Sequence, residues 1–132
     1  MKQEKLIKLV FKAAENAYCQ YSNYQVGACC LCKDGSYFLG ANIENASYGA
    51  TICAERNAVF AAYSNGYRKK DIEALCIVTY GKRIGSPCGI CRQVLAELIN
   101  QDTPIILANK EEVLITNISE LLPMQFSKED LD

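Results

Sequence analysis

The chain contains eight cysteines and no histidine, and this combination limits both its fold and its chemistry. An even number of cysteines in a short chain can indicate a secreted disulfide framework. That interpretation fits poorly here. Half of the 132 residues are apolar, which is enough to form a hydrophobic core without disulfide bonds. The N-terminus is charged and amphipathic, and it lacks the apolar run of a signal peptide. We therefore expect a cytoplasmic protein whose cysteines bind metal or pack in the core.

The absence of histidine excludes catalysis by Ser-His-Asp or Cys-His groups within the chain. A zinc site has to use thiolates or carboxylates, and a general base near neutral pH has to be a carboxylate or a lysine with a shifted pKa. The net charge of -1 lacks the basic excess of nucleic-acid-binding proteins. No apolar run approaches the ~20 residues of a membrane-spanning helix. We therefore expect no nucleic-acid partner and no membrane partner.

Strand-like and helix-like segments alternate along the chain, which predicts a central sheet with helices packed on it, in one domain covering residues 1–132. The dipeptide Asp34-Gly35 predicts a tight hairpin. The helix from residue 53 is apolar on every side in its middle, so we expect it to be buried all round. The predicted helices cover residues 5–18, 53–63, 88–99 and 118–122, and the predicted strands cover residues 25–33, 36–41, 72–80, 104–108 and 111–116.

Three cysteines lie where two of the predicted helices begin. Cys88 and Cys91 are three residues apart, so they share one helical face and can hold one ion, and Cys53 is the natural third ligand. The partial positive charge of helix N-termini favours the thiolates that bind metal. A structural zinc usually has four protein ligands, whereas a catalytic zinc has three and an open position for water. The pattern therefore favours a catalytic zinc, one per chain.

Two charged residues follow Cys53 closely. Glu55 is placed to take a proton from water bound at such a zinc. Arg56 can donate hydrogen bonds to the ligand sulfurs and so offset the charge of three thiolates. The alternative is a structural zinc module for protein binding, which predicts a fourth protein ligand. Other cysteines on a predicted strand have apolar neighbours, so we expect them to be buried by packing; they are Cys29, Cys30 and Cys32.

Five segments, in order, resemble the small homotetrameric zinc-dependent cytidine deaminases; they are residues 21–28, 42–48, 53–56, 86–94 and 121–131. Zinc-dependent base deaminases share cysteine ligands and a glutamate that is not a ligand. The resemblance implies a three-layer α/β/α sandwich with a five-stranded mixed sheet. It also implies hydrolytic deamination of cytidine and deoxycytidine with release of ammonia, in pyrimidine salvage. The partners it implies are a nucleoside substrate and three further copies of the chain. In such a homotetramer, neighbouring subunits complete each site.

The resemblance assigns zinc binding to Cys53, Cys88 and Cys91 and proton transfer to Glu55. It places Asn42 and Glu44 at the sugar hydroxyls, the Ala54 backbone at the polar edge of the base, Tyr24 as a wall against the base, and Phe126 in a neighbouring subunit's site. The family usually has phenylalanine at position 24 and often alanine at position 90, where this chain has Tyr24 and Ile90.

Related deaminases that act on blasticidin, nucleotides or nucleic acids use similar zinc motifs. The carboxylate of Glu44 beside the sugar would repel a phosphate group, which favours a free nucleoside. The acidic charge balance disfavours a polynucleotide.

Overall fold

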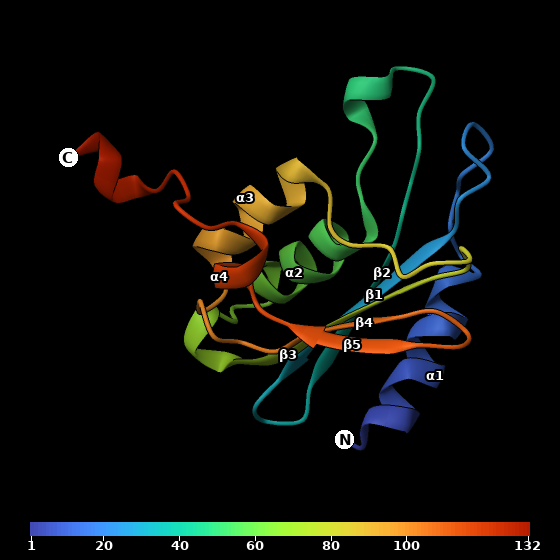
Figure 1. Cartoon of the computed structure of the whole chain (residues 1–132), viewed down its shortest axis with the longest axis horizontal. Helices are drawn as coiled ribbons and strands as arrows, with labels where there is room; N and C mark the ends of the chain where they lie inside the picture. The colour runs from blue at the N-terminus through green and yellow to red at the C-terminus, as the bar shows by residue number, and fades with distance from the viewer.

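The computed structural model describes residues 1–132, which form one five-stranded sheet in the order β2-β1-β3-β4-β5 (Figure 1). The pair β3–β4 is parallel and the other neighbouring pairs are antiparallel, so the sheet is mixed. The strands are β1 (Val26–Cys32), β2 (Tyr37–Ala41), β3 (Ile72–Thr79), β4 (Ile105–Ala108) and β5 (Val113–Thr116).

The helices cover both faces of this sheet, with α1 on one side and α2 and α3 on the other (Figure 1). One core forms where α1 packs on the sheet, and a larger one forms beneath α2 and α3. The predicted three-layer α/β/α sandwich is therefore confirmed. The α-helices are α1 (Gln3–Ala14), α2 (Ala54–Ser64), α3 (Gly89–Leu98) and α4 (Ile118–Leu121), and the 3-10 turns are η1 (Tyr48–Ala50), η2 (Lys69–Asp71) and η3 (Lys128–Leu131).

The hairpin predicted at Asp34-Gly35 joins β1 and β2. Gly35 has φ 92°, a left-handed conformation that glycine adopts without a steric penalty. Its N–H donates to the Cys32 carbonyl, while the Asp34 carboxylate accepts from the Ser36 N–H. The turn therefore has the local hydrogen bonds that its sequence predicts.

The first helix ends earlier than predicted. α1 ends at Ala14, and the chain after it runs beside the segment that follows β2. There the Tyr18 N–H donates to the Asn42 carbonyl at 2.9 Å, and the Glu44 N–H donates to the Tyr18 carbonyl at 2.7 Å. These long-range bonds bring residues 18–24 next to residues 42–44.

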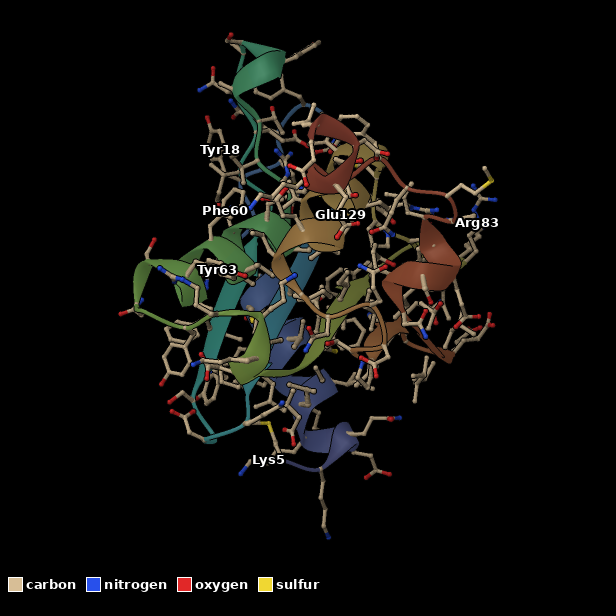
Figure 2. All side chains as sticks on the ribbon, turned by 90° about the vertical axis from the view of Figure 1, so that its left-hand side faces the viewer. Lys5, Tyr18, Phe60, Tyr63, Arg83 and Glu129 are labelled. Carbon is tan, nitrogen blue, oxygen red and sulfur yellow. The ribbon has the colours of Figure 1, made fainter.

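The expectation that the second helix is buried all round is wrong. α2 packs one face on the sheet, where Ala58, Val59 and Ala62 are buried. Its outer side carries Phe60, which is 39% exposed (Figure 2). A helix laid on a sheet buries the stripe that faces the sheet, so an apolar residue on the opposite stripe stays at the surface of the chain.

Gly40 of β2 allows α2 to lie very close to the sheet. An ideal Cβ at Gly40 would lie 2.7 Å from the backbone nitrogen of Ala58 and would also overlap the Ala54 carbonyl. Without that side chain, the first two turns of α2 rest directly on the β2 backbone. This close contact fixes the position of the N-terminus of α2.

Three cysteines of the sheet are fully buried, namely Cys29, Cys30 and Cys76. Burial raises the pKa of each of these thiols to about 12, which keeps them protonated and unreactive at neutral pH. Cys32 is buried as well, and all eight cysteines are free thiols. The predicted packing role of the β1 cysteines is confirmed. No helix has both the length and the apolar character needed to cross a bilayer.

Candidate active site

The N-termini of α2 and α3 meet on the same face of the sheet and bring three sulfur atoms together. Cys53 is the N-cap of α2, Cys88 is the N-cap of α3, and Cys91 lies in the first turn of α3. Their Sγ atoms all lie within 4.8 Å of one another, and those of Cys53 and Cys88 are 3.8 Å apart. The two cysteine segments, 35 residues apart in sequence, therefore form one cluster.

Arg92 holds the loop that leads into α3. Its guanidinium donates to the carbonyls of Pro87 at 2.7 Å and Leu121 at 2.6 Å, and to the Ser86 hydroxyl at 2.9 Å. These bonds tie the start of α3 to α4, so the position of Cys88 does not depend on the cluster alone.

The geometry of the sulfur cluster fits a tetrahedral zinc ion. With Zn–S bonds of ~2.3 Å, tetrahedral angles require sulfur atoms ~3.8 Å apart. The Cys53–Cys88 separation of 3.8 Å matches this value. The three thiols are the only group of three or more metal-ligating side chains found, so the donor set has three protein ligands and no fourth. Such a set is typical of a catalytic zinc site and argues against the structural zinc module.

The cluster already favours a thiolate without metal. Hydrogen bonds from the Cys91 thiol and from Arg56 lower the pKa of Cys53 below its ordinary value, against the opposing effect of burial. The Arg56 Nη2 donates to the Cys53 Sγ at 3.5 Å. Since thiolates are the form that binds metal, these contacts prepare the site for a cation.

Glu55 lies beside the sulfur cluster and is 4% exposed. Burial raises the pKa of its carboxyl to about 7, and the negative charge of Cys53 adds to the rise. A carboxyl that titrates near neutral pH can both accept and return a proton, which is the property that general acid–base catalysis requires.

Glu55 and the cluster border a cavity of about 300 Å³. Six of the residues that the sequence singles out line this cavity together with Glu55; they are Tyr24, Asn42, Glu44, Cys53, Ala54 and Cys88. Cys91 is buried behind the cavity, in the first turn of α3. Ala54 is the first residue of α2, where a backbone N–H has no acceptor within the helix and is free to bind a ligand.

Asn42 and Glu44 also organise the chain around the cavity. The Asn42 side chain accepts from the Val26 N–H at 3.0 Å and donates to the Tyr24 carbonyl at 2.8 Å. Glu44 Oε1 accepts from the N–H groups of Tyr21 and Ser22, at 3.0 and 3.1 Å. Both side chains line the cavity and have further hydrogen-bonding capacity, because an amide and a carboxylate can make more bonds than these.

The charge of Glu44 is secured by its surroundings. Its Oε2 accepts a hydrogen bond from the Ser22 hydroxyl. This hydroxyl, together with the Ser22 and Tyr21 N–H groups, holds the pKa of the Glu44 carboxyl below its usual value. The cavity is thus lined by an ionised carboxylate and by two cysteines of the cluster, Cys53 and Cys88.

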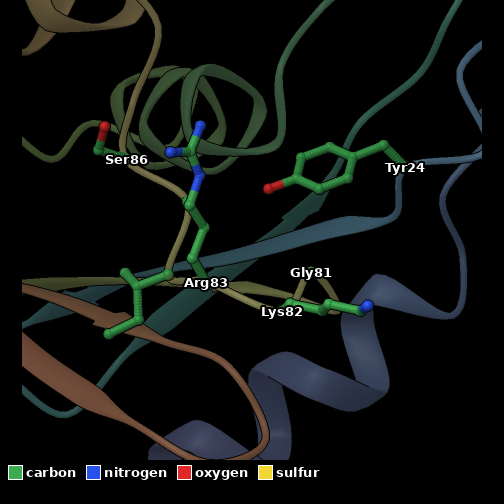
Figure 3. Close-up of a pocket in the computed structure, with 7 residues that line it drawn as sticks. Tyr24, Gly81, Lys82, Arg83 and Ser86 are labelled. Carbon is green, nitrogen blue, oxygen red and sulfur yellow. The ribbon is translucent and has the colours of Figure 1, made fainter.

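Tyr24 forms a shared wall between this cavity and a more open cleft of about 830 Å³, formed with residues 81–86. Figure 3 shows the Tyr24 ring reaching across toward the loop of Gly81, Lys82 and Arg83, with its hydroxyl at the leading end. The side chain that the sequence predicts as a wall therefore lies at the cavity, and its hydroxyl points at the loop between β3 and α3.

Phe126 does not line the cavity of its own chain. It is 58% exposed on the C-terminal tail, where its carbonyl accepts from Gln93 of α3 at 2.8 Å. The tail extends away from the sheet beyond α3 and α4 (Figure 1). Within one chain the structure therefore separates Phe126 from the other predicted site residues.

Several cavity residues were not predicted from the sequence; they are Ser22, Val26, Thr51, Ile77, Thr79, Gly85 and Ser86. Ser22 and Ser86 lie inside residues 21–28 and 86–94, two of the segments that carry the family resemblance. Their position in these segments is a signal that could have identified them. Thr79 lies at the end of β3, where only the register of the strand brings it to the cavity.

Comparisons with known proteins agree with this arrangement. Residues 1–107 match the family model described as the cytidine and deoxycytidylate deaminase zinc-binding region. A cytidine deaminase of Halalkalibacterium halodurans is 50% identical over 100% of this chain and 99% of its own length, and one of Sporosarcina psychrophila is 48% identical over 99% and 96%. The crystal structure of a cytidine deaminase from Burkholderia pseudomallei superposes with a TM-score of 0.92 at 42% identity, covering 96% of this chain and 100% of that chain.

The family model spans both cysteine segments, and the relatives align over essentially the whole chain. The three-sulfur cluster supplies the ligand set for the zinc that the family's description names. This chain therefore belongs to the zinc-dependent cytidine and deoxycytidylate deaminase family.

Proposed function

We propose that this enzyme hydrolyses cytidine and deoxycytidine to uridine and deoxyuridine with release of ammonia. The observation that carries the proposal is the single cavity that joins the cysteine cluster, the buried Glu55 and the ionised Glu44. The relatives named above are cytidine deaminases over nearly their full lengths, which supports the same substrate class here. A role in pyrimidine salvage follows from that substrate class.

Each group in the cavity has a defined part in this reaction. Cys53, Cys88 and Cys91 would hold a zinc ion, which would supply the Lewis acidity that makes water nucleophilic at neutral pH. Glu55 takes a proton from the attacking water and delivers it to the ring nitrogen next to the amino-bearing carbon. Glu55 then passes the water's second proton to the departing amino group. Cytidine and water are thereby converted to uridine and ammonia.

The remaining groups position the nucleoside. The free N–H at the start of α2, at Ala54, is placed to bind the polar edge of the base. Tyr24 covers one side of the cavity and offers an aromatic face to the base. Asn42 and Glu44 are placed to bind the sugar hydroxyls.

Glu44→Gln should raise the KM for cytidine by about tenfold and change kcat less, because hydrogen bonds to a charged group contribute about 1.5–3 kcal/mol. The glutamine keeps an oxygen for the Tyr21 and Ser22 N–H groups, and its amide nitrogen can donate to the Ser22 hydroxyl, which donates to Oε2 in the wild-type protein. Steady-state kinetics on 2′,3′-dideoxycytidine, which lacks the 2′ and 3′ hydroxyls, is the control. An equal rise of KM on both substrates would remove the sugar-binding role.

Arg56→Ala should lower kcat by about 10–100-fold, the usual effect of losing a partner of a metal ligand. The Arg56 guanidinium donates to Cys53, and its Nε is buried without a partner, so the side chain has a larger role toward the cluster than toward the fold. Arg68→Ala is the matched comparison, because Arg68 donates to the backbone carbonyls of Tyr63 and Tyr67, outside the cavity, and its loss should lower the thermal midpoint without lowering kcat. Unchanged turnover in Arg56→Ala would contradict this assignment.

We propose further that residues 1–132 act as one cytidine deaminase domain, in a homotetramer, in the cytoplasm. One sheet with a core on each face supports a single domain. Phe126 and Tyr48 are exposed in the isolated chain, which fits contacts with neighbouring subunits, including a Phe126 that reaches another subunit's cavity. Eight free thiols fit a reducing compartment. Sedimentation equilibrium measures the oligomeric state directly.

The decisive experiment is ammonia release by purified protein, with zinc content measured alongside. We expect turnover of cytidine with about one zinc per chain, and much slower turnover of cytidine monophosphate and blasticidin S. Faster turnover of either of these than of cytidine would change the proposed substrate. Zinc-loaded protein that releases no ammonia from any of the three would contradict the proposed function.

A further inference from the structure

Tyr24 and Gly85 meet at the rim of the cavity from two distant parts of the chain. Tyr24 lies just before β1, and Gly85 lies in the loop between β3 and α3. Both residues line the cavity and the adjoining cleft. The contact between them is therefore part of the wall that separates the two.

No side chain larger than hydrogen fits at position 85 beside the Tyr24 hydroxyl. An ideal Cβ at Gly85 would lie 2.5 Å from the Tyr24 hydroxyl oxygen and 2.9 Å from the Thr79 Cγ2. Both distances are shorter than non-bonded carbon contacts allow. The backbone does not require glycine here, because only Gly35 and Gly66 have positive φ among the glycines. Space for the neighbouring side chains is the remaining reason for glycine at this position.

Neither segment is free to move apart. The Tyr24 carbonyl accepts from the buried Asn42 side chain at 2.8 Å, and its N–H donates to the Ser22 hydroxyl at 3.1 Å. On the other side, the Gly85 N–H donates to the hydroxyl of the buried Thr79 at 3.3 Å. A side chain at position 85 would therefore be accommodated by rotation of the Tyr24 ring rather than by separation of the two backbones.

We propose that Gly85 is a positioning residue that sets the angle at which the Tyr24 ring closes the cavity over a planar heteroaromatic base. The absent side chain leaves the space that the Tyr24 hydroxyl occupies. Figure 3 shows the ring extended toward this loop with the hydroxyl leading. The inference rests on the proposed function in one respect, since it takes a base as the occupant of the cavity.

The test compares alanine at two glycines of the same loop. Gly85→Ala should lower kcat/KM for cytidine by about tenfold or more, mainly through KM, because a displaced ring narrows the cavity while Glu55 and the cysteines stay in place. Gly81→Ala is the matched control. An ideal Cβ there lies 3.4 Å from the Arg83 carbonyl oxygen, 3.6 Å from the Tyr24 Cε1 and 4.0 Å from the Tyr24 hydroxyl. These are ordinary contacts, so the kinetics of Gly81→Ala should stay within about twofold of wild type.

Compensating substitutions separate ring displacement from damage to the loop. Tyr24→Phe removes the hydroxyl, and Thr79→Ser removes the Cγ2 while keeping the hydroxyl that accepts from Gly85. Adding Gly85→Ala to the Tyr24→Phe/Thr79→Ser background should change KM by less than about threefold. A loss as large as in the wild-type background would overturn the proposal, and so would a Gly85→Ala enzyme with wild-type KM.

The steric coupling can also be measured without catalysis. The thermal midpoint should fall in Gly85→Ala, recover in the compensated background, and stay unchanged in Gly81→Ala. If the wild-type protein does not deaminate cytidine, the proposed function fails while this cycle still decides whether Gly85 makes room for Tyr24. If the wild-type protein is active and the cycle shows no coupling in midpoint or KM, the positioning role fails and the function stands.

Discussion

Glu55→Gln should lower the turnover of cytidine by a factor of about 10²–10⁴, the usual contribution of a positioned acid–base group, while the bound zinc remains. The three candidate zinc ligands are cysteines, so replacing the Glu55 carboxyl with the amide of glutamine should leave the metal site intact. The carboxyl is buried, with its pKa raised to about 7, and glutamine has nearly the same size but cannot exchange a proton. The measurement is ammonia release together with zinc content per chain.

Glu97→Gln is the matched control, because Glu97 is an exposed carboxylate on α3, outside the cavity. Its turnover and zinc content should equal those of the wild-type protein. Retention of most activity in Glu55→Gln would show that another group moves the proton. Loss of zinc in that variant would instead place Glu55 among the groups that hold the metal.

Cys88→Ala should reduce bound zinc from about one per chain to a small fraction and abolish turnover, because the remaining two thiols cannot complete a three-ligand site. Cys88 suits this test better than Cys91. Its side chain is exposed, whereas Cys91 is fully buried and its removal would also leave a cavity. The readouts are metal analysis of the purified protein and ammonia release.

Cys19→Ala provides the control, since Cys19 is a partly exposed thiol outside the sulfur cluster. It should keep both zinc and activity. Far-UV circular dichroism of Cys88→Ala without metal shows whether the chain remains folded, as two sheet-based cores predict. Full zinc occupancy in Cys88→Ala would contradict the three-cysteine site.

Local patterns predicted most of the secondary structure. The order of helices and strands and the Asp34-Gly35 hairpin follow from periodicity and turn chemistry, which are short-range properties. The end of α1 was predicted too late, because residues 15–18 continue the helical pattern. What ends the helix is a set of hydrogen bonds to residues 42–44, which no local pattern shows.

The candidate site divides in the same way. Cys88 and Cys91 lie three residues apart at the start of one helix, so the sequence spacing alone predicts that they act together. Glu55 lies two residues after Cys53, so its place near that cysteine is predicted in the same way. The exposed Phe60 on α2 could not be predicted, because composition does not say which stripe of a helix meets the sheet. Phe126 is exposed and lies outside the cavity of its own chain, so its contact with a neighbouring subunit stays a prediction.

The sequence by itself determined which groups are available for the proposed chemistry: thiols instead of histidines as metal ligands, and carboxylates as candidate proton carriers. Only the tertiary structure decided the environment that gives these groups their properties. Burial beside Cys53 raises the pKa of Glu55 to about 7, and the contact between Tyr24 and Gly85 shapes the wall of the cavity. The first effect depends on desolvation and the second on close packing between segments far apart in the chain. Both arise only once folding has brought these segments together.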